Sequence, residues 1–211
     1  TAACDGLLKV DNRGLKAVNG FGQMMIATRH GNFAVKKGDK LAGTRIIPLV
    51  IEEEKMEAAK KAAAEATEGC PILELKPFLH KKVGIVTTGN EVFYGRIKDT
   101  FTPVIRGKLS EFDTEVIDHV TWNDDDTKVT ASILDMIQKG ADVVVCTGGM
   151  SVDPDDKTPL AIRNTGADIV SYGAPVLPGA MFLLAYYQVK DGENPRTVAI
   201  MGLPGCVMYA R

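Results

Sequence analysis

Four segments in the second half of the chain carry the residues best able to do chemistry. They are residues 88–91, 95–100, 123–126 and 148–156, where carboxylates and small hydroxyl residues stand beside glycines or in short turns. Glycine leaves backbone amides open to an anion, and carboxylates can hold a hydrated magnesium ion that bridges to a phosphate. Taken singly, each segment also has a structural explanation, because glycines form turns and aspartates cap helices or pair with surface cations. Together they predict a phosphate-binding site with Asp99, Asp124 and Asp156 around the glycine amides.

Residues 143–158 organise the rest of the chain. Three successive valines, residues 143–145, predict a strand buried on both faces, and Gly148-Gly149 then form a turn. Ligands of open α/β sheets bind beyond the carboxyl ends of the strands, so the loop after this strand is the expected site. An ordinary polar loop between a strand and a helix is the alternative. Thr158 and Pro159 predict the start of the next helix, with Thr158 as its N-cap.

Asp156 is expected to have a metal-binding role rather than a capping role. If Thr158 caps the helix, the carboxylate of Asp156 is not needed for the helix amides and stays free. It stands close to Asp153 and Asp155, and three like charges repel one another unless a cation or water relieves them. Simple exposure to water is the alternative.

From residue 82 onward the pattern alternates regularly between strands and helices. Strands are expected at residues 83–87, 115–121, 141–147, near 169, at 182–189 and at 197–201. One helix is expected to be capped by Thr102, the next by Asp126 or Thr127, and a third is expected at residues 158–164. Polar composition predicts a turn at residues 190–195. Repeated βαβ units predict an α/β domain over residues 82–211, with a mostly parallel sheet in a three-layer α/β/α arrangement.

The first part of the chain has a different sequence pattern. Short apolar segments punctuated by glycines predict a small β-rich or α+β unit over residues 1–51. Alanine, glutamate and lysine dominate the next stretch and predict a solvated connecting helix over residues 52–70. His30 lies in one of the glycine turns, where a solvated histidine is expected rather than a metal ligand.

The composition limits the range of partners. The 211 residues carry a formal net charge of -2, which gives no electrostatic reason to expect nucleic acid or a membrane surface. No apolar run is long enough to span a bilayer. The cysteines (Cys4, Cys70, Cys146 and Cys206) lie far apart in sequence, which favours reduced thiols in a cytoplasmic protein. Because the chain begins on Thr1 and ends in a newly started helix, we expect a C-terminally truncated fragment of a longer protein.

Four ordered motifs resemble those of the molybdopterin-binding domains of molybdenum-cofactor biosynthesis proteins, the MogA and MoeA group. Residues 88–92 look like the family's T-G-D-E-L, residues 95–100 like G-x-I-x-D-[ST], residues 146–156 like S-G-G-V-S-V-G-x-x-D, and residues 202–205 like G-L-P-G. The resemblance covers residues 82–211 and implies a MogA-like fold. It also implies molybdopterin or its adenylylated form as ligand, Mg²⁺ as cofactor, and ATP or molybdate as further partners, and it is compatible with a homo-oligomer.

The resemblance further implies roles for single residues. Asp99, Asp124 and Asp156 match the carboxylates that the family uses for catalysis, and Asp156 matches the aspartate associated with the metal. The matched cofactor-binding residues are Thr88, Gly89, Glu91, Thr147, Gly148, Gly149, Ser151, Pro204 and Gly205. The phosphate end of the ligand is expected at residues 148–151, and Gly149→Val is expected to abolish pterin binding while the protein stays folded.

Two departures from the family pattern bear on the reaction. Residues 177–181 lack the lysines of the MoeA segment K-P-G-K-P, and Cys206-Val207 replace the asparagine and proline after G-L-P-G. Losing two cations beside an anionic ligand weakens the case for molybdate insertion. The expected function is molybdopterin binding in cofactor biosynthesis, as an adenylyltransferase or molybdenumtransferase. One alternative is a non-catalytic carrier or sensor. The other is a nucleotide pyrophosphatase similar to the CinA proteins, because residues 155–158 fit the end of the corresponding CinA loop.

Overall fold

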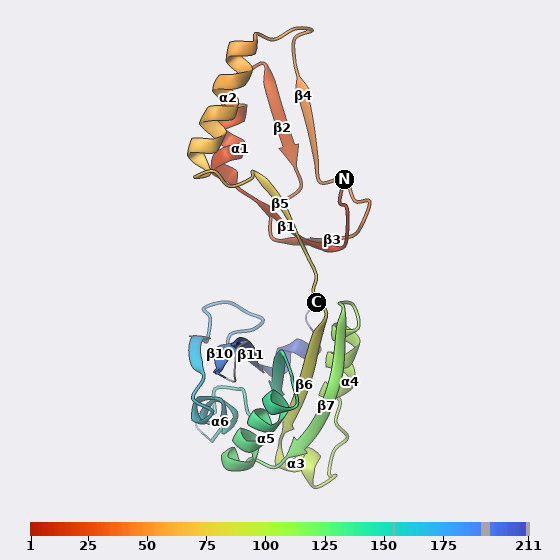
Figure 1. Cartoon of the computed structure of the whole chain (residues 1–211). Helices are drawn as coiled ribbons and strands as arrows, with labels where there is room; N and C mark the ends of the chain where they lie inside the picture. Colours follow the sequence, from red (N-terminus) through yellow and green to blue (C-terminus); the bar gives the residue numbers. More distant parts are fainter. Residues whose placement is uncertain (154, 191–194, 210–211) are drawn as a thin grey trace. The chain divides into compact units, whose positions relative to one another are not determined.

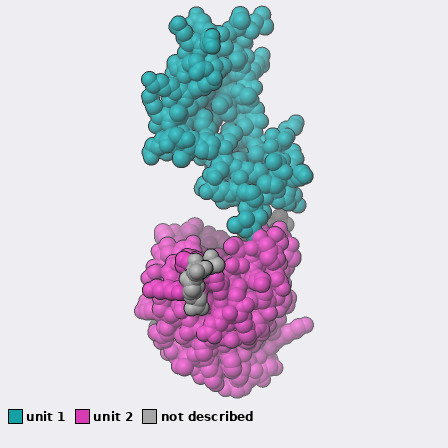
Figure 2. Space-filling view, viewed as in Figure 1, with its two compact units in different colours: residues 1–79 teal, residues 80–211 magenta. Residues whose placement is uncertain are grey.

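The computed structural model describes residues 1–153, 155–190 and 195–209 (Figure 1). The chain divides into two compact units, residues 1–79 and 80–211 (Figure 2). Each unit has a buried core of its own. Among the described residues, no helix combines the length and the apolar character needed to cross a bilayer. The second unit contains every segment in which the sequence predicts site residues.

The second unit is built on a six-stranded sheet in the order β7-β6-β8-β11-β10-β9. The strands are β6 (Lys81–Thr88), β7 (Thr114–Trp122), β8 (Val143–Thr147), β9 (Asp168–Tyr172), β10 (Leu183–Val189) and β11 (Arg196–Leu203). β6, β7, β8 and β11 are parallel, whereas β10 runs antiparallel to both β9 and β11. Strand β8 lies inside the sheet, as its valine run predicts, with Val144 and Cys146 fully buried. The turn predicted at residues 190–195 falls mostly outside the described residues.

Helices cover both faces of this sheet, which confirms the predicted α/β fold. They are α3 (Asn90–Phe93), α4 (Phe101–Leu109), α5 (Asp126–Gln138) and α6 (Thr158–Asn164), followed by the 3-10 helix η1 (Gly205–Met208). Because side chains alternate along β6, Ile85 packs with Ile105 of α4 on one face, and Val86 packs with the core of α5 and α6 on the other. Gly84 allows α5 to approach β6, since a Cβ there would lie 2.4 Å from the sulfur of Met136.

The first unit contains two small sheets and two helices. Its elements are β1 (Gly6–Val10), α1 (Asn12–Asn19), β2 (Met24–Thr28), β3 (Phe33–Val35), β4 (Ala42–Ile46), α2 (Glu53–Ala66) and β5 (Leu73–Pro77). One sheet has the order β3-β1-β5, and the other is the antiparallel pair of β2 and β4. The unit's buried core of Ala2, Leu8 and Val35 belongs to the three-stranded sheet.

Helix α2 differs from the solvated connector that the sequence predicts over residues 52–70. It packs against α1, and Ala59 on its inner face is only 2% exposed. Strand β5, which follows it, pairs with β1 from Gly6 opposite Pro77 to Val10 opposite Leu73. The first unit therefore continues to residue 79 instead of ending at residue 51. Alanine buries little area, but it lets two helices pack closely, and composition alone cannot distinguish this use from exposure to solvent.

Candidate functional site

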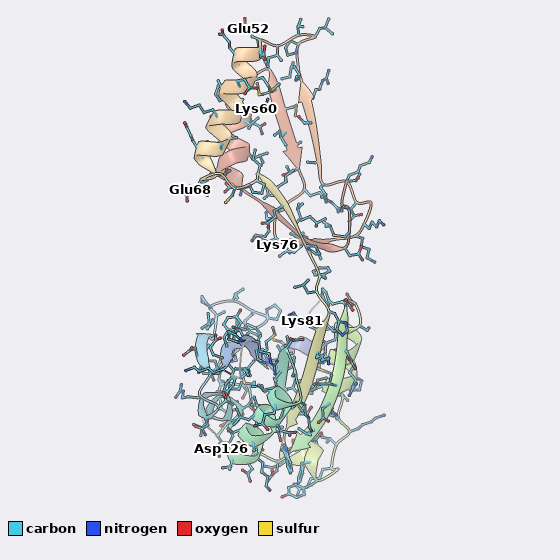
Figure 3. All side chains as sticks on the ribbon, viewed as in Figure 1. Glu52, Lys60, Glu68, Lys76, Lys81 and Asp126 are labelled. Atoms are coloured by element: carbon cyan, nitrogen blue, oxygen red, sulfur yellow. The ribbon has the colours of Figure 1, made fainter. Side chains whose placement is uncertain are left out.

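The predicted site loops meet at one edge of the six-stranded sheet. The register pairs Thr88 of β6 with Trp122 of β7, and Thr147 of β8 with Leu203 of β11, so the carboxyl ends of these parallel strands lie side by side. Figure 3 shows Lys81, the first residue of β6, and Asp126, just after β7, at opposite ends of this unit. The segments after β6, β7, β8 and β11 all start at the end marked by Asp126. The structure thus brings the four motifs to a common edge.

Asp99 caps helix α4 from the loop after β6. Its Oδ1 accepts hydrogen bonds from the amides of Phe101 (2.9 Å) and Thr102 (3.1 Å), and its Oδ2 accepts one from the hydroxyl of Thr102 at 2.5 Å. Helix α4 therefore begins at Phe101, two residues before Pro103, the first helical residue expected after a cap at Thr102, because the carboxylate binds the first free amides. The aspartate predicted to be catalytic is held in place by the start of a helix.

A chain of buried hydroxyls leads from Asp99 towards the loop after β8. The Oγ1 atoms of Thr102 and Thr87 lie 3.1 Å apart, and Oγ1 of Thr147 donates to Oγ1 of Thr87 at 3.3 Å. Nε2 of His119 lies 3.1 Å from both Thr87 and Thr102. Each of these threonines is at most 6% exposed, so their hydroxyls depend on one another rather than on water.

Thr88 and Thr158 extend this chain of hydroxyls to the loop that contains Gly148 and Gly149, here called the glycine loop. The set is called the threonine network and consists of Thr87, Thr88, Thr102, Thr147 and Thr158. Thr88 Oγ1 donates to the carbonyl of Thr147 (3.3 Å) and lies 3.1 Å from Thr158 Oγ1, which donates to the carbonyl of Gly148 at 2.8 Å. The prediction that Thr158 is an N-cap is wrong. It is the first helical residue, with Lys157 in the N-cap position, because its hydroxyl bonds to the loop instead of to a helix amide.

Gly148 and Gly149 let the loop after β8 pack tightly against the end of β6. Both have positive φ angles, +82° and +53°. A Cβ on Gly148 would lie 2.0 Å from the carbonyl oxygen of Thr88, and one on Gly149 would lie 2.9 Å from Oγ1 of Thr158. We therefore expect Gly149→Val to destabilise the fold as well as the site, because a β-branched residue is strained at this φ and would displace Thr158.

Asp156 closes the loop that follows the glycines. Its Oδ2 accepts hydrogen bonds from the amide (2.5 Å) and the hydroxyl (2.8 Å) of Ser151, so the carboxylate is not free as the sequence argument expects. The same loop borders a pocket of 330 Å³, whose lining includes Ser151, Asp153, Asp156, Arg163 and Tyr172. A pocket of this size with a hydroxyl, two carboxylates, a guanidinium and an aromatic ring can hold a small polar ligand.

Asp124 lies in the short segment between strand β7 and helix α5. It is exposed, and its neighbour Asp125, not Asp126 or Thr127 as predicted, caps helix α5 by accepting a hydrogen bond from the amide of Lys128 at 3.1 Å. Among the described residues, no three His, Cys, Asp or Glu side chains are close enough to hold a metal ion together. An all-protein metal cage is therefore not present in that part of the chain.

The residues around Asp156 fit a magnesium ion of the kind held partly by ligand. Mg²⁺ is usually bound by one or two carboxylates together with waters and phosphate oxygens. Asp153 and Asp156 both line the pocket, and Oδ1 of Asp156 accepts no hydrogen bond from the described residues. Asp156 is the residue best placed to hold such an ion.

Other predicted cofactor-binding residues occupy the same edge. The amide of Gly89, at φ +140°, donates to the carbonyl of Trp122 at 3.1 Å, and Glu91 is exposed in helix α3. Pro204 and Gly205 follow β11, where a Cβ on Gly205 would come within 3.8 Å of the Phe101 ring. Their positions suit contact with a ligand, and their roles stay predictions.

Sequence reasoning missed several residues at this edge. The side-chain oxygen of Asn123 is buried and has no hydrogen-bond partner among the described residues, as expected of a group that a ligand or water satisfies. Phe93 and Trp122 stack with ring centroids 6.1 Å apart, and Arg163 lines the pocket. Asn123 lies in the predicted segment 123–126 but is not singled out there, Trp122 is marked in the sequence by its place at a strand end, and Arg163 reaches the pocket through helix packing.

Burial lowers the pKa of His119 below its usual value, although Asp99 lies 3.9 Å away. The unfolded chain therefore takes up this proton at a higher pH than the folded protein, and stability is lost as the pH falls below about 6.5. We expect His119→Gln to reduce the fall in unfolding free energy between about pH 6.5 and 5. Denaturant titrations of both proteins over a pH series measure this change in the pH dependence of the unfolding free energy.

His80 provides a control, because its pKa is shifted in the opposite direction to that of His119. A hydrogen bond with Asp113 raises the pKa of His80, so its stabilising contribution is present at low pH and is lost as the pH rises through the raised pKa. His80→Gln should therefore leave the acid-side loss in place. If the slope of unfolding free energy against pH is unchanged in His119→Gln, His119 is not the cause of the loss of stability at low pH.

Residues 84–211 match the family model described as a probable molybdopterin binding domain. The chain belongs to this family. This molybdopterin-binding domain is similar in fold to the tungsten cofactor synthesizing protein MoaB of Pyrococcus furiosus, with a TM-score of 0.52 and 24% identity, covering 61% of this chain and 84% of that one. The family resemblance predicted from the motifs is thereby confirmed.

Curated relatives of this chain include CinA-like proteins. One from Mycobacterium tuberculosis (strain ATCC 25177 / H37Ra) is 32% identical over 90 residues, which make up 42% of this chain and 21% of that protein. Another, from Syntrophus aciditrophicus, is 36% identical over 81 residues, 38% of this chain and 19% of its own length. The matched part thus spans about a fifth of these relatives.

Proposed function

We propose that the molybdopterin-binding domain binds molybdopterin or its adenylylated form at the carboxyl edge of its sheet, as a step of molybdenum-cofactor biosynthesis. The observation that carries the proposal is the convergence of the family's four motif loops at this edge, where Thr88 and Thr158 of the threonine network join the end of β6 to the loop after β8. The phosphate end of the ligand lies against residues 148–151, beside the pocket lined by Ser151 and Asp156.

Groups around this edge support a phosphate-bearing pterin. The guanidinium of Arg163 on the pocket wall can form charge-assisted hydrogen bonds with a phosphate. The unsatisfied side-chain oxygen of Asn123 can accept a hydrogen bond from a ligand. Phe93 is 38% exposed and offers a ring face next to Trp122, on which a planar heterocycle can stack.

Asp156 gives this proposal its direct test. We expect Asp156→Asn to weaken molybdopterin binding about tenfold or more in the presence of Mg²⁺ and to leave binding without Mg²⁺ unchanged. Asparagine can still accept the hydrogen bonds from Ser151, so the loop and the melting temperature should be preserved. Calorimetric titrations of both proteins with and without Mg²⁺ measure this. Equal affinities under both conditions would show that the carboxylate only closes the loop.

The reaction that we propose is adenylylation rather than molybdate insertion. Residues 177–181 carry no lysine that could receive molybdate. An adenylyltransferase releases pyrophosphate from ATP when molybdopterin is present, whereas a carrier or sensor binds the pterin without turnover. Measuring pyrophosphate release with and without molybdopterin separates these two classes.

A nucleotide pyrophosphatase is the second candidate, and the identity to CinA-like proteins favours it. Asp155, Asp156, Lys157 and Thr158 lie in the loop after β8 and fit the ending of the CinA loop. Incubation with ADP-ribose and Mg²⁺ would yield AMP if this candidate is right. Absence of AMP, together with pterin binding, would leave the first candidate.

A further inference from the structure

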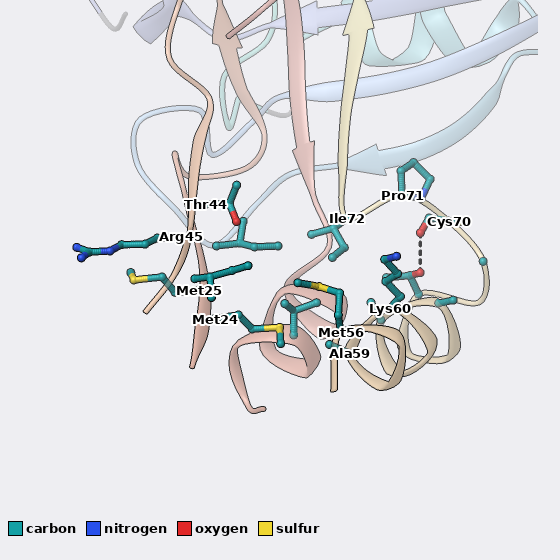
Figure 4. A pocket seen from close by; sticks show the side chains of 17 residues that line it. Met24, Met25, Thr44, Arg45, Met56, Ala59, Lys60, Cys70, Pro71 and Ile72 are labelled. Atoms are coloured by element: carbon teal, nitrogen blue, oxygen red, sulfur yellow. Dashed lines mark hydrogen bonds between the residues drawn. The ribbon is translucent and has the colours of Figure 1, made fainter. Parts of the chain in front are cut away.

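The first unit contains an open cavity of 680 Å³ between the β2–β4 pair and helix α2 (Figure 4). Met24 of β2 and Met56 of α2 extend into it from opposite sides, together with Ile72 (Figure 4). We call this space the apolar cavity, because aliphatic side chains and methionines make up most of its lining. Its charged lining residues, Arg45 and Lys60, are both cations, and no carboxylate lines it among the described residues.

The apolar cavity lies where the β2–β4 pair would be expected to have a core. The buried cluster of this unit, formed by Ala2, Leu8 and Val35, lies at the other sheet. A two-stranded sheet is marginally stable by itself and needs an apolar surface against one face. Methionine adapts its shape to different neighbours, so a lining rich in methionine suits an inserted apolar segment.

An exposed apolar segment follows directly after strand β4. It comprises residues 47–51, here called the apolar run, which are isoleucine, proline, leucine, valine and isoleucine. Ile47 is 60% exposed, Leu49 104% and Val50 84%. Contiguous exposed apolar residues on a protein surface mark an interaction site.

We propose that the apolar run of one copy of this chain inserts into the apolar cavity of a second copy, and the reverse, in a two-fold symmetric dimer. A two-fold interface uses the same patch on both copies, so a single surface must carry both the cavity and the run that fills it, as this unit does. The pairing removes both apolar surfaces from water at once.

The charges that flank the apolar run support a second copy of the chain as the partner of the apolar cavity. Glu52, Glu53 and Glu54 follow the apolar run directly, and Lys60 is a cation of the cavity lining, whereas the guanidinium of Arg45 extends away from the cavity (Figure 4). Insertion brings three carboxylates of one copy towards Lys60 of the other. Lys60 also pairs with Glu57 of its own helix at 2.6 Å, and this exposed pair can be shared or exchanged at low cost.

The test is the mass of the complete chain in solution, measured by light scattering and sedimentation over a concentration series. We expect a dimer, and we expect Leu49→Glu with Val50→Glu to raise its dissociation constant at least about a hundredfold, because each dimer would then bury four carboxylates. These side chains are exposed in one copy, so the monomer should keep its melting behaviour. Phe33→Glu, at a residue 61% exposed on β3, is the matched control and should keep the dimer.

A second variant tests the cavity side. Ala63→Trp fills the apolar cavity and should also break the dimer, and mixing it with the Leu49→Glu, Val50→Glu protein should restore mixed dimers through the one intact contact. A wild-type chain that stays monomeric, or a dimer that survives the double substitution, would overturn the proposal. A small apolar molecule found in the purified protein by native mass spectrometry, and displaced by Ala63→Trp, would overturn it as well.

Discussion

Replacing Gly148 by alanine is expected to destabilise the molybdopterin-binding domain by about 3 kcal/mol or more. The φ of +82° costs an L-residue backbone strain, and the added Cβ would lie 2.0 Å from the carbonyl oxygen of Thr88. Relief would require the loop after β8 to move away from β6, which would break the hydrogen bond between Thr158 and the Gly148 carbonyl. Chemical denaturation of both proteins measures the difference in unfolding free energy.

Gly166 is a matched control for this substitution. It has the same φ of +82°, but a Cβ there would meet no atom within 4 Å. Gly166→Ala should therefore cost only the backbone strain, about 1 to 2 kcal/mol. The difference between the two variants isolates the close approach of the glycine loop to β6. Equal losses in stability would show that packing at Gly148 contributes nothing.

Thr102→Val is expected to destabilise the domain by about 2 to 3 kcal/mol and to weaken ligand binding. The hydroxyl of Thr102 donates to Asp99 at 2.5 Å and lies 3.1 Å from both Thr87 and His119. Valine has nearly the same shape, so the change removes the hydrogen bonds while leaving a buried histidine nitrogen and a carboxylate less satisfied. Unfolding free energy and molybdopterin affinity are the two measurements.

Thr102→Ser should restore most of both properties, because serine keeps the hydroxyl and loses one methyl group. If valine and serine reduce affinity equally, the methyl group and not the threonine network supports the loop that carries Asp99. If valine lowers stability but not affinity, the network stabilises the fold without positioning Asp99 for the ligand.

Local patterns determined much of the molybdopterin-binding domain. The three valines of β8 predict an interior strand because a strand buried on both faces requires apolar residues at every position, and the sheet order places it between β6 and β11. The spacing of strands and helices predicts the parallel sheet, since short βαβ connections leave few other topologies. The four motif loops could be expected at one edge for the same reason, because the carboxyl ends of parallel strands lie together.

Contacts between distant residues decided what local patterns could not. The sequence predicts Thr158 as a cap and Asp156 as a free carboxylate, but the hydroxyl of Thr158 bonds to Gly148 and the carboxylate of Asp156 bonds to Ser151. A hydroxyl or carboxylate can choose among several partners of similar strength, and the choice depends on which of them the fold brings within 3 Å.

Tertiary structure also decided where the first unit ends. Helix α2 and strand β5 belong to it because α2 packs on α1 and β5 pairs with β1, whose residues lie more than 60 positions away in sequence. An alanine-rich helix has the same local signature whether it packs on another helix or extends into solvent. Residue types alone therefore determined that a helix forms here, and only the long-range pairing of strands determined which unit contains it.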